Sequence, residues 1–164
     1  MSIAAAFIKE LDMEATATRK CLERIPESKW SFKPHPRSMV MSDLVQLVAE
    51  IPQWITHIAQ DSEIDLATYP HPKFTTTQEV VKHFNEGLEN AKKALSKLSD
   101  EDFNKQFQLK SEGKVLSTEV AVDTITNTIN HWVHHRGQLT VYMRLNDIPV
   151  PSIYGPSADE NPYK

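Results

Sequence analysis

The stretch Asn130-His131-Trp132-Val133-His134-His135-Arg136-Gly137-Gln138-Leu139 holds three of the chain's seven histidines. No proline occurs between Val115 and Ile148, so the stretch can lie inside one long helix. Residues four apart stand on the same face of an α-helix. The spacing therefore places His131 and His135 where two imidazoles can share one metal ion, as they do in H-E-x-x-H helices.

An apolar stripe predicts which face of this helix is buried. It consists of Val122, Ile125, Ile129, Trp132, Leu139 and Met143, and Arg136 interrupts it. The histidine pair lies beside the stripe, in a polar strip with Thr124, Asn127, Thr128, Gln138 and Tyr142. In a helix bundle such a strip can line a cleft, because each helix touches two neighbours. The alternative is that these are ordinary surface or core histidines.

Periodic apolar residues predict four helices. The first runs from Ser2 to about Glu23, the second begins with Ser42 as its cap, the third runs from Thr77 to about Ser99, and the last runs from Ser117 or Thr118 to Asn146. Pro52 is expected to kink the second helix. Residues 61–76 form a connecting loop. Phe103, Phe107 and Leu109, followed by Glu112-Gly113, indicate an extended or hairpin excursion before the last helix.

Several segments resemble the DinB family of metal-dependent helical proteins. They are residues 130–144 (NHWVHHRGQLTVYMR), the tail 149–160, and the stretches 22–26 and 30–36. The resemblance implies one all-α domain over residues 1–164: an up-down-down-up four-helix bundle with a long crossover between helices 2 and 3. It also implies a divalent metal on three histidines, two of which correspond to His131 and His135. Homodimers, a stress-related role, and hydrolase or thiol-transferase activity are further implications.

The third metal ligand of the family pattern is missing from this chain. The pattern L-x-x-H-x-A-E-x-P-x-W corresponds here to residues 44–54, and Leu47 occupies the histidine position. A catalytic zinc normally has three protein ligands, so zinc, nickel or iron is expected to bind weakly or not at all. Glu50, one turn beyond Leu47, is the best substitute, because a carboxylate is a good ligand for these metals. The alternative is that Glu50 is a solvated helix residue.

Net charge, cysteine count and hydrophobicity disfavour several classes of protein. The net charge of −4 gives no basic footprint for nucleic acid. The single cysteine, Cys21, excludes an internal disulfide and is expected to be a small core residue. The N-terminus lacks the basic region of a signal peptide, and no apolar run approaches the length of a membrane span. A cytoplasmic protein is expected.

Three functions stay open. The first is a metal-dependent enzyme. The second is a non-catalytic protein that binds a small molecule in the bundle cleft, and the third is a stress-related dimer without chemistry. Val133 and Val141 lie outside the stripe and favour a homodimer. Arg136 is expected to pair with a carboxylate or with loop carbonyls, although together with His134 it could bind an anion.

Two polar residues of the first helix lie close to its apolar stripe. Glu14 and Thr18 can therefore face either the interior of the bundle or a solvated edge.

Overall fold

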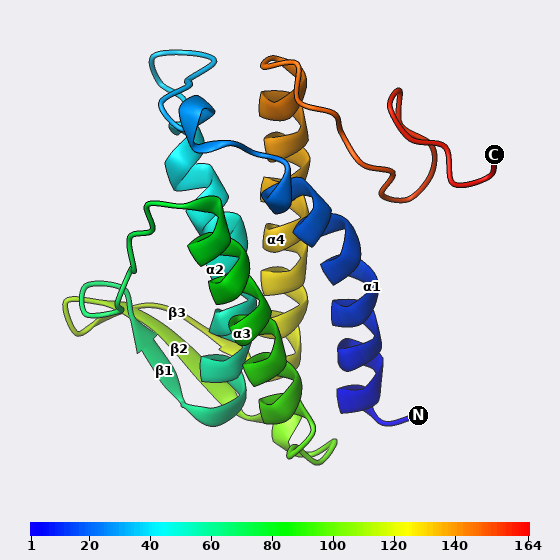
Figure 1. Ribbon diagram of the computed structural model, residues 1–164. Coiled ribbons are helices and arrows are strands. Elements are labelled where there is room, and N and C mark those ends of the chain that lie inside the picture. Colours follow the sequence, from blue (N-terminus) through cyan, green and yellow to red (C-terminus); the bar gives the residue numbers. More distant parts are fainter.

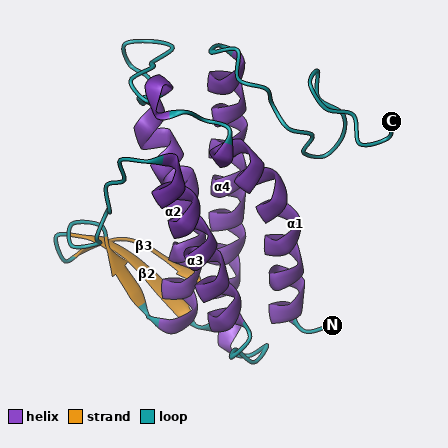
Figure 2. Ribbon diagram, viewed as in Figure 1, coloured by secondary structure: helices purple, strands orange, loops and turns teal.

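Four long helices and a small sheet make up the chain (Figures 1 and 2). The computed structural model describes residues 1–164. The helices are α1 (Ile3–Glu23), α2 (Met41–Gln60), α3 (Thr77–Leu95) and α4 (Ala121–Arg144). The strands are β1 (Glu63–Asp65), β2 (Gln106–Ser111) and β3 (Lys114–Val120), and two short 3-10 turns are η1 (Glu27–Lys29) and η2 (Asp102–Asn104).

The helices lie side by side, and α2 occupies a central position. It packs against both α3 and α4, while α1 packs mainly against α3. In Figure 1, α1 and α4 run in one direction, and α2 and α3 run in the other. The connection between α2 and α3 therefore returns along the molecule, and it contains β1.

The helix starts differ in how they are capped, and the two caps predicted from the sequence, Ser42 and Thr77, are both wrong. Ser2 caps α1, because its side chain accepts a hydrogen bond from the Ala5 amide. The second cap was wrong: α2 begins at Met41 after Val40, which makes no side-chain cap. The third cap is Thr76 instead of Thr77, and with Glu79 it forms a reciprocal capping box.

The sheet corrects the expected all-α fold class. β2 and β3 form an antiparallel hairpin, and β1 pairs with β2 in parallel. The hairpin excursion before the last helix is confirmed, but it continues to Val120, so α4 starts at Ala121 rather than at Ser117 or Thr118. Residues 61–76 are likewise not only a loop, because β1 lies within them.

A tight turn closes the hairpin and is tied to the crossover. Glu112 and Gly113 both have positive φ angles, of 50° and 74°, a conformation that glycine adopts without strain. The Asp65 carboxylate accepts hydrogen bonds from the amides of these two residues, at 3.0 and 2.7 Å. One side chain thus fastens the end of β1 to a turn that lies far along the chain.

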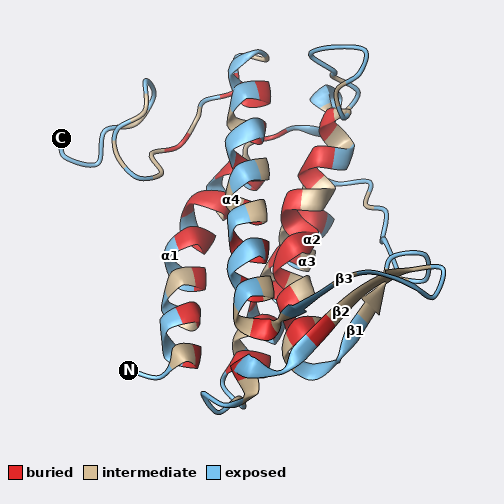
Figure 3. Ribbon diagram, turned by 180° about the vertical axis from the view of Figure 1, so that it is seen from behind, coloured by how far each residue is buried: buried red, intermediate tan, exposed pale blue.

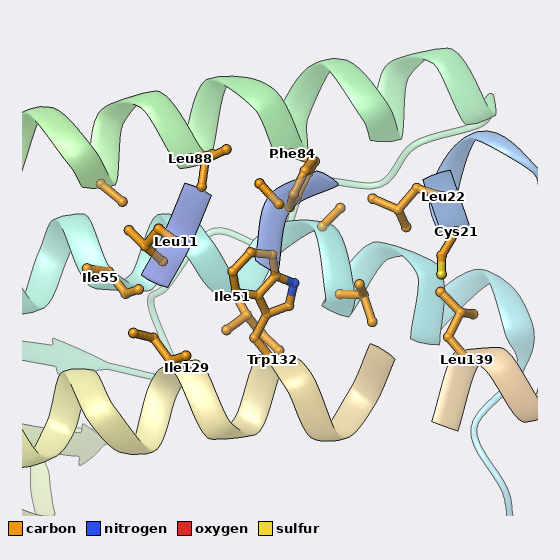
Figure 4. Packing of buried hydrophobic residues seen from close by; sticks show 14 of the residues in the cluster. Leu11, Cys21, Leu22, Ile51, Ile55, Phe84, Leu88, Ile129, Trp132 and Leu139 are labelled. Atoms are coloured by element: carbon orange, nitrogen blue, oxygen red, sulfur yellow. The ribbon is translucent and has the colours of Figure 1, made fainter. Parts of the chain in front are cut away.

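The core lies between the inward faces of the helices (Figure 3). In Figure 4, Trp132 of α4 lies among apolar side chains of α1, α2 and α3, and its ring centroid is 5.8 Å from that of Phe84. Cys21 is fully buried in this core, as expected. Burial raises the pKa of its thiol to about 11, so the thiol is neutral and unreactive at neutral pH.

A buried polar network joins α1, α4 and the C-terminal tail. Arg136 is 1% exposed and forms an ion pair of 2.6 Å with the Glu14 carboxylate. Its guanidinium also donates to the Glu14 carbonyl, the Thr18 hydroxyl and the Tyr154 hydroxyl. Arg136 therefore pairs with a carboxylate, as predicted, and it is not available to bind an anion with His134. Glu14 and Thr18 are interior residues, not a solvated edge.

The structure bears on two expectations about the surface, namely membrane spans and the valines expected at a dimer interface. No helix is long and apolar enough to cross a membrane. Val141 is exposed, while Val133 is half-buried against the core. The homodimer therefore stays a prediction.

Candidate functional site

An apolar cavity of about 470 Å³ lies between α2, α4 and the sheet. Its wall is built from seven hydrophobic residues and a few polar ones. The volume falls within the range of about 300–1,000 Å³ that is typical of small-molecule sites, which are also mostly apolar. The cavity is therefore the first candidate for a functional site.

One face of the sheet forms the cavity's outer wall. Phe107 and Glu119 are direct partners across β2 and β3, and Leu109 and Ser117 are the next pair along. Ile64 of β1 lies opposite Leu109 and extends that row. All five side chains line the cavity, as expected because alternate residues of a strand point to the same face.

The inner wall comes from α4. Thr124, Asn127, Thr128 and His131 line the cavity, and their spacing of three and four residues places them on one helix face. This is the polar strip beside the apolar stripe, and the prediction that it lines a cleft is confirmed for these residues. The other three strip residues, His135, Gln138 and Tyr142, do not line the cavity.

Aromatic and aliphatic residues of α2 and the crossover complete the lining: Trp54, Ile58, Leu66 and Tyr69. The Trp54 ring contacts both Tyr69 and His131, with ring centroids 6.4 and 5.6 Å apart. Burial, followed by the nearby Glu50 carboxylate, raises the pKa of the Tyr69 hydroxyl, so Tyr69 is a neutral hydrogen-bonding group.

The structure brings His131 and His135 together, as the sequence predicts. Their Nε2 atoms are 2.7 Å apart, and His135 Nδ1 lies 2.8 Å from the side-chain oxygen of Gln138. An amide oxygen only accepts, so the proton of neutral His135 is on Nδ1 and its Nε2 is an acceptor. His131 therefore donates through Nε2.

His131 is held in its neutral form. Burial lowers its pKa, and the neighbouring His135 and His134 lower it further. A neutral imidazole is the form that binds metals. Two Nε2 atoms on one tetrahedral zinc would stand roughly 3.4 Å apart, given zinc–nitrogen distances of about 2.0–2.1 Å. The rings would have to separate before they could share an ion.

Glu50 does not join the histidine pair. It is 6% exposed, so the alternative of a solvated helix residue is wrong. Its carboxylate accepts a hydrogen bond from Trp54 Nε1 at 3.1 Å and lies 3.1 Å from His71 Nδ1. The sequence did not predict the contact with His71, which comes from the crossover loop.

Leu47 lies in a different place from the cavity. It is half-buried and lines a second, more polar hollow together with Glu50 and His71. No group of three or more His, Cys, Asp or Glu side chains is arranged to hold a metal ion. As they stand, His131 and His135 form a two-ligand half-site and do not fit the three-ligand site of a catalytic metal.

Glu119 is the polar residue of the cavity that sequence reasoning missed. It is exposed, and Asn127 Nδ2 donates to its carboxylate at 3.3 Å. No lysine, arginine or histidine forms an ion pair with it. Glu119 lies two residues after Ser117, a spacing that places both side chains on one face of a strand. The sequence instead led us to interpret this segment as the start of a helix.

These features define a class: a mainly helical protein whose apolar cavity lies between two helices and a small sheet, with one histidine of a close pair, His131, on one wall. The chain belongs to the DinB family, whose sequence profile matches residues 1–162. It is 26% identical over 155 residues to the uncharacterized protein YrdA of Bacillus subtilis (strain 168), covering 94% of this chain and 89% of that protein.

Solved structures share the fold. A DinB-like protein from Bacillus cereus ATCC 10987 has a TM-score of 0.73 at 23% identity, covering 93% of this chain and 98% of that one. The DinB-like protein YjoA from Bacillus subtilis also has a TM-score of 0.73, at 17% identity, covering 90% of this chain and 97% of that one. Likeness at these identities extends to the fold alone.

Proposed function

We propose that this protein binds a small, mainly apolar molecule in the cavity between α2, α4 and the sheet. The observation that carries the proposal is a cavity in which seven hydrophobic side chains and a smaller number of polar ones line one hollow, which is the usual composition of a ligand site. The proposal treats the four helices as an up-down-down-up bundle with the sheet as its side wall. Metal-dependent hydrolysis or thiol transfer is less well supported, because the donor set lacks a third ligand.

The polar residues of the lining would orient such a molecule. The imidazole of His131 and the hydroxyls of Thr124 and Thr128 stand on one wall. Both threonine hydroxyls already donate to carbonyls one turn back along α4, so they offer lone pairs as acceptors. A hydroxyl, amide or amine group on the ligand would satisfy them, and the apolar part would cover Phe107 and Leu109.

A cavity-filling pair of variants tests the proposal. The probe is 3-phenyl-1-propanol, and its binding is followed by calorimetry and by the shift in thermal unfolding, because a ligand that binds only the folded state stabilises it. Ser117→Phe should abolish binding by filling the cavity. Thr118→Phe, one residue along on the opposite face of β3, should leave binding unchanged. Equal binding by both variants would refute the site.

A weak metal site is a second candidate function, favoured by the convergence of the two Nε2 atoms. Zinc, nickel or iron would bind His131 and His135 after the two rings separate. Glu50 is the third ligand proposed from the sequence, and it would first have to leave Trp54 and His71. Loss of metal binding in Glu50→Gln would identify it as a ligand.

A further inference from the structure

The charge of the cavity lining indicates which small molecules fit it. Among the lining residues, Glu119 is the only one with a carboxylate, and none is a lysine or an arginine. Lys110, next to the lining residue Leu109, is paired with Glu63 and does not itself line the cavity. The lining therefore offers a negative charge and no strong positive charge.

Glu119 is positioned for a partner that the chain does not supply. Asn127 orients its carboxylate from α4, and no cationic side chain forms an ion pair with it. Its cross-strand neighbour Phe107 lines the apolar part of the same cavity. A ligand could place a charged group at Glu119 and still bury its apolar part.

The aromatic residues of the lining also favour a positive charge on the ligand. Trp54 and Tyr69 pack edge to face, with an interplanar angle of 87°, and Phe107 lines the sheet side. The faces of aromatic rings attract cations. An anion in the cavity would lie among these rings and the Glu119 carboxylate with no lysine or arginine on the lining to compensate it.

We propose that the cavity selects an apolar molecule that carries one protonated amine, with the nitrogen at Glu119 and the apolar part between the helices and the sheet. The inference rests on the proposed small-molecule function and specifies its ligand class. Alkyl amines have pKa values near that of lysine, about 10.4, so they are cationic at neutral pH.

Three probes that differ only in their polar group test the selection: 3-phenylpropylamine, 3-phenyl-1-propanol and 3-phenylpropionate. In calorimetric titrations the amine should bind about fivefold more tightly than the alcohol, a size expected for a partly exposed charge pair with aromatic contact. The propionate should bind most weakly. Raising the salt concentration should shrink the preference for the amine, because exposed charges are screened.

Glu119→Gln keeps the shape of the side chain and removes its charge. The variant should bind the amine about as weakly as the alcohol, so the ratio of the two affinities should fall from about five to about one. Glu23→Gln is the matched control: it removes the same charge from an exposed site on α1, away from the cavity lining. This control should keep the wild-type preference for the amine.

The outcomes separate the inference from the function on which it rests. If the alcohol and the amine bind equally well and Glu119→Gln changes neither, the amine class is wrong and the cavity function stands. Tighter binding of the propionate would also overturn the amine class. If none of the three probes binds the wild-type protein, the cavity function itself fails.

Discussion

Two polar centres, around His131 and Arg136, lie on α4 only five residues apart. They differ in how many of their polar groups have hydrogen-bond partners inside the protein. Arg136 is buried, and its donors are taken up by Glu14, Thr18 and Tyr154. His131 is half-buried, its Nε2 contacts only His135, and its ring lines a cavity. The first centre is closed within the protein, and the second is open to a ligand.

The difference teaches how to separate structural from functional polar residues on one helix. A buried charge is tolerated when partners inside the fold satisfy it, and it then fixes the packing of the elements that supply them. Arg136 joins α1 to the tail in this way. A polar group that lines an apolar cavity and has no hydrogen-bond partner on another helix does not fix the packing of that helix, so it can serve a bound molecule instead.

The largest change in the free energy of unfolding is expected at the closed centre around Arg136. Arg136→Met should lower the free energy of unfolding by about 3–5 kcal/mol, because it leaves the Glu14 carboxylate buried without its cation. Arg144→Met removes an exposed arginine paired with Asp159, and it should lower the free energy of unfolding far less, because solvent screens this pair. Urea unfolding measures both values. Equal losses would contradict the assignment of Arg136 as the structural centre.

A smaller effect is expected at the open centre around His131, where the free energy of unfolding should depend on pH. Because the folded pKa of His131 lies below its ordinary value, the unfolded chain binds more protons in mildly acidic solution. The free energy of unfolding should therefore fall as the pH drops from about 7 through the ordinary histidine value of about 6.5.

His131→Gln should reduce this slope in urea titrations at several pH values. The pKa of His83 on α3 is also lowered by burial, so His83→Gln should remove a separate part of the slope. An unchanged slope in His131→Gln would mean that folding does not lower the pKa of His131.

The smallest effect is expected for metal binding. Zinc at about 0.1 mM should raise the free energy of unfolding by less than about 0.5 kcal/mol, because two imidazoles alone hold the ion weakly. Leu47→His should strengthen zinc binding, because residue 47 is the position of the missing third histidine and three imidazoles can hold zinc. Tight binding of one equivalent by the wild type would contradict the weak two-ligand site, and no gain in Leu47→His would place residue 47 away from the histidine pair.

The sequence predicted the four helices because each repeats apolar residues over several turns. It also predicted the proximity of His131 and His135, since spacing along one helix fixes that contact. The strand β3 was hidden because Val115 and Leu116 are both exposed and because the Ser117-Thr118 pair resembles a helix cap. Pairing with β2 decided the outcome, and no local pattern encodes such pairing.

The partners of the candidate polar residues depended on contacts that no local pattern reveals. Glu50 meets His71 across a loop, and Glu14 meets Arg136 from the opposite end of the chain. Burial of Glu50 is not apparent from the sequence either, because a glutamate on a helix is usually solvated. Tertiary packing thus decided which candidate ligands meet and which do not.

The tie between Asp65 and the hairpin turn bears on how the outer wall of the cavity opens. Its two ends are 47 and 48 residues apart, and the whole of α3 lies between them. Together with the pairing of β1 and β2, it fastens the hairpin to the crossover rather than to a helix, so we expect the outer wall to open as a unit separate from the helices. In hydrogen exchange the amides of β2 and β3 should then open as one unit, at lower cost than those of α2. Ligands would enter through this transient opening.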